Sequence, residues 1–115
     1  MNKHIPGLMK LCLQGYQEVM WYTMGDIVVS MLSGRIMTYL GFKELWVDEF
    51  SVHPDYQRQG IGTKMIEYVR EQLKQETEKI SYIVLNTERG YPSVKFYEAN
   101  GFEADESLVF MAADV

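Results

Sequence analysis

The feature that most constrains this chain is a short segment with two glycines, set between runs of different hydrophobic pattern. Residues 44–52 form an apolar run rich in Trp, Val and Phe, which is typical of a strand buried on both faces. Residues 63–79 repeat apolar side chains at every fourth position, as an amphipathic helix does. Residues 80–86 are a second short apolar run. The order predicts a parallel strand–helix–strand unit with a right-handed crossover.

The segments before this unit carry weaker, local signals. Leucine and valine side chains at helical spacing predict one helix over residues 6–20, followed by a turn over residues 21–25. Residues 26–32 and 35–42 are expected to form the two strands of a hairpin, because Ser33-Gly34 is a turn signal.

The segments after the unit are a helix and a tail. Pro92 suits the first turn of a helix, and Asn100-Gly101 is expected to end it. Residues 102–115 have room for two short strands around Asp105 and Glu106. The whole pattern predicts an α/β (α+β) fold with a mixed sheet flanked by helices.

Length and composition narrow the class of protein. A chain of 115 residues with 47% hydrophobic and 23% charged residues fits one globular domain, residues 1–115. Without an apolar run of about 18 residues or an apolar signal core we expect no membrane span and a cytoplasmic protein. The net charge of −5 disfavours nucleic acid and is compatible with a cationic partner. Cys12, the single cysteine, is interpreted as a small buried hydrophobe.

The segment between the strand expected over residues 44–52 and the helix expected over residues 63–79 has the properties of an anion site. Gly60 and Gly62 allow the backbone to approach a ligand closely, and the N–H groups at the helix start are unpaired. Such N–H groups bind phosphate or pyrophosphate, to which Arg58 and Thr63 can add contacts. The spacing matches neither a Walker loop nor G-x-G-x-x-G. The alternative is that the glycines serve only the turn.

Two motifs here resemble those of the GNAT superfamily of N-acyltransferases. Residues 52–62, V-H-P-D-Y-Q-R-Q-G-I-G, resemble motif A, Q/R-x-x-G-x-G/A. Residues 96–102, F-Y-E-A-N-G-F, resemble motif B, F-Y-x-x-x-G-F, and begin 34 residues after Gly62. The resemblance covers residues 26 to about 110. It implies a GNAT-like, mostly antiparallel sheet and an N-acetyltransferase that moves an acetyl group from acetyl-coenzyme A to a primary amine by direct attack in a ternary complex.

The resemblance also implies where the cofactor lies. The loop backbone would hold the pyrophosphate, and the end of the preceding strand would pair with the pantetheine arm and polarise the thioester carbonyl. The cofactor would enter where the sheet splays between residues 44–52 and 80–86. The implied cofactor-binding residues are Ser51, Val52, Gln57, Arg58, Gln59, Gly60, Ile61, Gly62, Thr63 and Asn86.

Tyr97 matches the general acid of the family, because a phenol near the sulfur can protonate the departing thiolate. The alternative is a helix residue that packs its ring in the core. A base is also needed, since only roughly one alkylamine in a thousand is unprotonated at neutral pH. Asp48 and Glu49 precede the loop, and strand alternation lets only one of them face the acceptor. Glu49 shares a face with Ser51 and is favoured, unless a bulge intervenes; both acids are alternatively solvated strand-end residues.

Neither histidine is assigned to the chemistry. His53 precedes Pro54 and matches a common loop residue of the family, so it is interpreted as structural. His4 and His53 have no third ligand at suitable spacing, and no metal is expected.

The sequence departs from the family pattern at two places. Gly90 and Ser93 stand where motif B usually has Asn and Ala, a loss for which Asn86 and Thr87 can compensate. Only 25 residues precede Asp26, whereas most members have a strand and two helices there that shape the acceptor pocket.

A missing first strand would leave a sheet edge open at the hairpin, and open edges pair with other chains. We therefore predict a homodimer. A single monomeric species in light scattering at micromolar concentration would contradict it.

The acceptor stays open among a small cationic amine, an aminoglycoside-like polyamine and a protein N-terminus. The alternative function is a non-catalytic acyl-coenzyme A-binding module that has lost its acceptor site. A structural domain without a ligand is a third possibility, which motif A disfavours.

Overall fold

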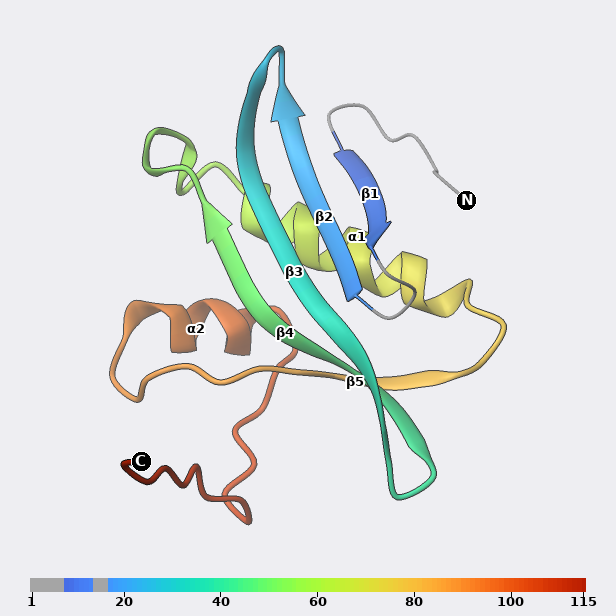
Figure 1. Cartoon of the computed structure of the whole chain (residues 1–115). Coiled ribbons are helices and arrows are strands. Elements are labelled where there is room, and N and C mark those ends of the chain that lie inside the picture. The colour runs from blue at the N-terminus through green and yellow to red at the C-terminus, as the bar shows by residue number, and fades with distance from the viewer. Residues whose placement is uncertain (1–7, 14–16) are drawn as a thin grey trace.

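The computed structural model describes residues 8–13 and 17–115. Its centre is one sheet of five strands in the spatial order β1-β2-β3-β4-β5 (Figure 1). The strands are β1 (Leu8–Leu13), β2 (Gln17–Met24), β3 (Ile27–Tyr39), β4 (Phe42–Val52) and β5 (Ile80–Val84). Neighbours are antiparallel except for β4 and β5, which are parallel. The mixed, mostly antiparallel sheet is therefore confirmed.

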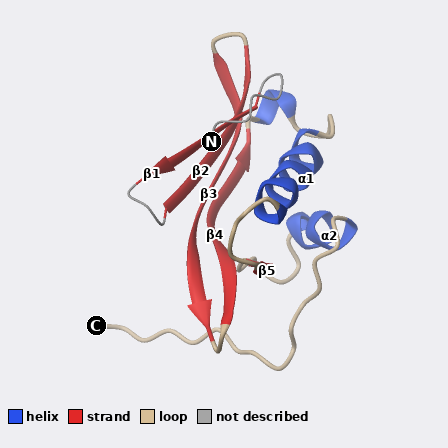
Figure 2. Cartoon of the chain, turned by 90° about the vertical axis from the view of Figure 1, so that its right-hand side faces the viewer, coloured by secondary structure: helices blue, strands red, loops and turns tan. Residues whose placement is uncertain are grey.

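Helices α1 (Ile61–Lys74) and α2 (Pro92–Ala99) lie on the same side of the sheet (Figure 2), and a short 3-10 turn, η1 (Pro54–Tyr56), precedes α1. The apolar stripe of α1 packs onto the sheet and forms the core. The buried residues of this core, from the sheet and from α1, are Met20, Leu32, Leu45, Met65, Ile66, Tyr68, Val69 and Leu73. The helix expected over residues 63–79 is present but ends at Lys74, because residues 75–79 have no apolar side chain to bury. None of the described helices is long and apolar enough to cross a membrane.

The N-terminal helix expected over residues 6–20 is wrong. Residues 8–13 and 17–24 are strands that pair with each other, with Leu11 opposite Val19; residues 6, 7 and 14–16 lie outside the described residues. The expected turn over residues 21–25 also fails, because β2 continues to Met24 and the turn falls at Gly25-Asp26. Pairing of β2 with β3 favours the extended conformation here, and the spacing of apolar residues alone does not predict that pairing.

Ser33-Gly34 is not a hairpin turn. Strand β3 runs through both residues, and the hairpin turns at Leu40-Gly41. Gly34 is needed for another reason: a Cβ atom there would lie 2.3 Å from the carbonyl oxygen of Trp46 on β4. The register also shifts at this point, so the glycine marks a close backbone approach beside a β-bulge.

The C-terminal segment agrees in part with expectation. Strand β5 is parallel to β4, and α2 ends at Asn100-Gly101, where Gly101 has φ +87°. The two short strands expected in residues 102–115 are absent. Asp105 instead accepts hydrogen bonds from the backbone and hydroxyl of Ser107, which closes a turn with no strand beside it.

The N-terminal edge of the sheet also differs from expectation. The first strand expected to be missing is present as β1, so the edge lies at β1 and not at the hairpin. Between β1 and η1 no helix occurs among the described residues. The homodimer stays a prediction, without the reason first given for it.

The close approach at Gly34 gives a test of this packing. Gly34→Ala is expected to lower the free energy of unfolding by about 1–3 kcal/mol, because the methyl group forces β3 away from β4. Chemical denaturation measures the change. Ser33→Ala alters the neighbouring residue and serves as the control; a Gly34→Ala variant as stable as the parent would contradict the close approach.

Candidate active site

Strands β4 and β5 separate part-way along β4. Their pairing ends at Trp46 opposite Val84, although β4 continues to Val52. A cavity of about 420 Å³ lies where they part. It is lined by Val47, Asp48, Glu49, Phe50, Ser51, Leu85, Asn86 and Tyr97. The cavity therefore brings together the three residues predicted for catalysis and two of those predicted for cofactor binding, Ser51 and Asn86.

Phe50 connects β4 to α2 on the helix side of this cavity. Its ring lies 5.9 Å from that of Phe96 and 6.4 Å from that of Tyr97, measured between centroids. Gly62, in the first turn of α1, makes room for the contact: a Cβ atom there would lie 3.0 Å from the Phe96 ring. Gly62 is thus needed for packing as well as for any approach of a ligand.

Tyr97 combines the two interpretations given to it from the sequence. Its half-buried ring packs between Phe96 and Phe102, at 5.3 and 5.4 Å, and the residue also lines the cavity. Burial raises the pKa of the Tyr97 phenol above its usual value. The phenol therefore holds its proton at neutral pH and can donate it.

A β-bulge sets the direction of the two acidic residues. Ser33 pairs with Glu49 and Gly34 with Val47, which leaves Asp48 as an extra residue of β4. Val47 and Phe50 both pack against the core, although strict alternation would place residues three apart on opposite faces. Asp48 and Glu49 both lie between them, and both are exposed. The expectation that only one of them could face the acceptor therefore does not hold.

The two acids differ in their partners. The guanidinium of Arg35, on β3, donates two hydrogen bonds to the Asp48 carboxylate, at 3.2 and 3.1 Å. The carboxylate of Glu49 has no hydrogen bond or ion pair with any described residue. Sequence reasoning missed this partner, because Arg35 lies 13 residues away and meets Asp48 only across the bulge.

The end of β4 presents alternate backbone groups to the cavity. His53 donates its N–H to the carbonyl of Val29, so Ser51 also lies in a hydrogen-bonded pair of the β3–β4 ladder. Phe50 and Val52 therefore direct their N–H and C=O groups to the unpaired side. The hydroxyl of Ser30 further donates to the Ser51 carbonyl at 2.8 Å. Phe50 was not among the predicted ligand residues; the alternation from His53 is what identifies it.

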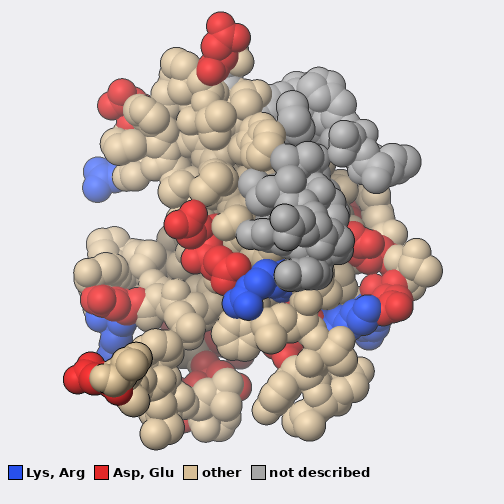
Figure 3. All heavy atoms as spheres, viewed as in Figure 1, with Lys and Arg blue, Asp and Glu red and all other residues tan. Residues whose placement is uncertain are grey.

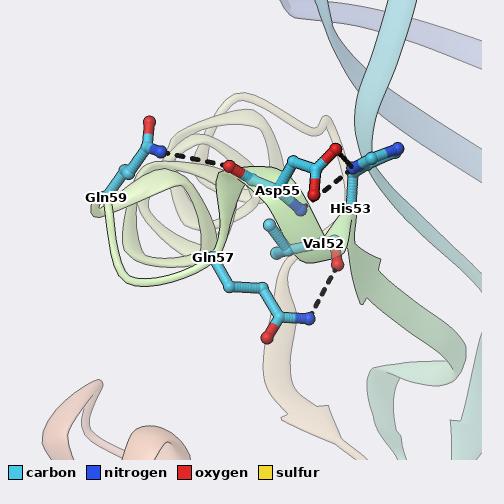
Figure 4. A network of polar contacts seen from close by, with 5 residues as sticks. All are labelled: Val52, His53, Asp55, Gln57 and Gln59. Carbon is cyan, nitrogen blue, oxygen red and sulfur yellow. Dashed lines mark hydrogen bonds and ion pairs between the residues drawn. The ribbon is translucent and has the colours of Figure 1, made fainter.

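The loop from β4 to α1 is held by its own side chains (Figure 4). Gln57 donates to the carbonyl of Val52 at 3.0 Å, and Gln59 to that of Asp55 at 3.3 Å. His53 accepts from the Asp55 N–H through Nδ1, which agrees with its structural interpretation. These bonds fix the shape of the loop without using the N–H groups at its tip.

The tip of the loop leaves a row of backbone donors open. Arg58 and Gly60 have positive φ, +64° and +79°, and the first hydrogen bond of α1 is from Lys64 to Gly60. Among the described residues, the N–H groups of residues 58–63 have no partner. Backbone donors of this kind at a helix N-terminus suit an anion such as a pyrophosphate.

The model of the acetyltransferase (GNAT) domain family matches residues 16–104. The chain belongs to this family. A curated relative, the S-(2-succino)cysteine N-acetyltransferase of Bacillus subtilis (strain 168), is 28% identical over an alignment of 100 residues that covers 80% of this chain and 59% of the relative. The chain thus spans less than two thirds of that enzyme.

Two solved structures share the GNAT fold. An aminoglycoside acetyltransferase from an uncultured soil metagenomic sample, in complex with sisomicin, has a TM-score of 0.77 at 16% identity. The alignment covers 89% of this chain and 68% of that one. An aminoglycoside 6'-N-acetyltransferase from Acinetobacter haemolyticus has a TM-score of 0.70 at 17% identity, over 89% and 73%. These likenesses concern the fold.

Two further features of this GNAT domain bear on the predicted site. Thr87 does not reach the cavity: its hydroxyl lies 2.8 Å from that of Ser93, and the pair ties the segment after β5 to α2. Asn86 lines the cavity, whereas Thr87 does not. No group of three His, Cys, Asp or Glu side chains that could hold a metal ion occurs among the described residues.

The raised pKa of Tyr97 predicts a pH dependence of stability. The folded state keeps the phenolic proton above about pH 10, where the unfolded state loses it. The stabilising contribution is therefore complete below about pH 10 and is lost as the pH rises through the folded pKa. The free energy of unfolding between about pH 9 and 12 should fall more steeply for the parent than for Tyr97→Phe. Equal slopes would contradict the burial, and Tyr82→Phe, which removes an exposed phenol, is the control.

Proposed function

We propose that this protein transfers an acetyl group from acetyl-coenzyme A to a primary amine by direct attack in a ternary complex. One observation carries the proposal: the cavity between β4 and β5 holds a protonated phenol and two carboxylates. The loop with open backbone donors directly follows the same strand. An acyl transfer to an amine needs an acid, a route for a proton and a place for the cofactor, and all three are adjacent here.

The described residues fit the cofactor. Residues 58–63 offer N–H groups to the pyrophosphate, and Arg58 adds a positive charge. Phe50 and Val52 offer backbone groups on the unpaired side of β4, where an extended pantetheine arm can pair as an added strand. An N–H there would also polarise the thioester carbonyl. Acetyl-coenzyme A itself supplies an activated acyl group and a thiolate leaving group.

The side chains supply the proton transfers. The C–N bond forms as the C–S bond breaks, the phenol of Tyr97 gives its proton to the departing sulfur, and the amine loses one. Glu49 is the favoured acceptor of that proton, directly or through water, because its carboxylate has no other partner among the described residues. Asp48 is less suited to accept the proton because its carboxylate already accepts two hydrogen bonds from Arg35.

A small-molecule amine is the proposed acceptor. The relative from Bacillus subtilis is named for an amino-acid conjugate, and the two solved structures are named for aminoglycosides. The net charge of −5 also favours a cation. A homodimer belongs to this proposal, since the outer edge of β5 pairs with no strand among the described residues and open edges pair with other chains.

A non-catalytic acyl-coenzyme A-binding module is the second candidate. It is favoured by the lack of any helix before η1 among the described residues. The family usually shapes its acceptor pocket from helices in that region. The two candidates share cofactor binding and differ in turnover.

The test combines thermal unfolding with and without acetyl-coenzyme A and thiol release against a panel of amines. A ligand that binds only the folded state stabilises it by about 2.7 kcal/mol at a hundredfold excess over Kd. A shift together with thiol release supports the enzyme. A shift without release for any amine favours the binding module, and no shift at millimolar cofactor would contradict both.

The role of Tyr97 is tested in the same assay. Tyr97→Phe is expected to lower kcat by roughly 10²-fold while the cofactor-induced thermal shift stays that of the parent, because the ring remains and only the acidic proton is lost. Tyr82→Phe, outside the cavity, is the matched control. Unchanged turnover of the Tyr97→Phe variant over the whole pH profile would remove Tyr97 from the mechanism.

A further inference from the structure

The bulge in β4 gives the site a charge arrangement that a regular strand would not have. Ser33 and Arg35 alternate with the core residue Leu32 and therefore lie on the face of β3 away from the helices. Glu49 pairs with Ser33, and Asp48 contacts Arg35, so both carboxylates lie on that same face. Acidic and basic side chains lie directly beside each other near the middle of the face seen in Figure 3.

Arg35 engages one of the two acids and leaves the other free. Its Nε and one Nη each donate to a different oxygen of Asp48, at 3.2 and 3.1 Å, in the side-on geometry that fixes both groups. Glu49 has no such partner among the described residues. The two carboxylates line the cavity, and with the guanidinium that pairs with Asp48 they sum to a charge of −1, where the two acids alone would give −2.

We propose that Arg35 sets an acceptor preference: by holding Asp48 it favours amines with a single positive charge near the reacting nitrogen over amines with a second charge close by. The single charge of a monocation is attracted by the carboxylate of Glu49. A second ammonium close by is repelled by the guanidinium of Arg35, and Asp48 attracts it only weakly because Asp48 is already paired. The inference rests on the proposed function and deepens it.

The proposal gives an ordered charge series. Summed over the three described side chains Arg35, Asp48 and Glu49, the charge is −1 in the parent, −2 in Arg35→Met, 0 in Asp48→Asn and −1 again in the double variant. A diamine carries one more positive charge than a monoamine of equal length, so its relative rate follows the local charge. The groups are partly exposed, and each unit of charge is expected to change the ratio by about threefold at low salt and by less at physiological salt.

The experiment measures kcat/KM with acetyl-coenzyme A for 1-aminobutane and 1,4-diaminobutane, with a statistical correction for the two equivalent nitrogens of the diamine. The diamine-to-monoamine ratio should rise about threefold in Arg35→Met, fall about threefold in Asp48→Asn and return to the parent value in the double variant. Lys74→Met is the matched control, because it removes a positive charge that pairs with Glu71 on α1, outside the cavity. Its ratio should equal that of the parent.

Each alternative outcome has one meaning. A parent ratio in Arg35→Met, or an equal loss for both amines, would overturn the specificity role and leave only a structural one. A parent that acetylates neither amine but others of the wider panel would show that the acceptor class is wrong while the proposed function stands. If no amine of the panel leads to thiol release by the parent protein, the proposed function is contradicted.

Discussion

The ring of Phe50 lies on the stretch of β4 beyond its last pair with β5, at Trp46, and it packs against two rings of α2. This contact holds α2 against the part of β4 that no longer pairs with β5. The cavity lies along this stretch and is lined by residues of β4, by the segment after β5 and by Tyr97 of α2. Gly62 admits the ring of Phe96 to the first turn of α1, so the loop with the open N–H groups is fixed by the same packing.

The bulge at Asp48 makes a second contribution to the site, and it has a structural origin. Gly34 brings the backbone of β3 against the carbonyl of Trp46, closer than any side chain would allow. The extra residue of β4 shifts the alternation by one, so that Leu45 and Val47 before the bulge and Phe50 after it all pack toward the core. The consequence is chemical: two consecutive acids share one face, and Arg35 on the neighbouring strand reaches only one of them.

The parts of this molecule that could be predicted from the sequence are those with local causes. The unit β4–α1–β5 is predicted by the spacing of apolar residues along the sequence. The loop before α1 and helix α2 are predicted by two short sequence motifs. The predictions from sequence fail where pairing with a strand that is distant in the sequence determines the local conformation. The spacing of Leu11 and Val19 suits a helix as well as a strand pair, and only pairing with β3 selects the strands. A glycine such as Gly34 indicates a turn or a close approach equally, and its neighbour across the sheet is not visible in the sequence.

The position of Tyr97 depends on contacts far from the chemistry. Helix α2 has eight residues and is too short to be stable by itself, so tertiary contacts must hold it. Thr87 and Ser93 join its N-terminal end to the segment after β5. At its other end Arg70 of α1 donates to the carbonyl of Asn100 and lies over the ring of Phe102, 5.5 Å from the centroid. A phenol that must stay protonated and near the cavity is therefore positioned from both ends of its helix, and the buried rings that raise its pKa are the ones that fix its place.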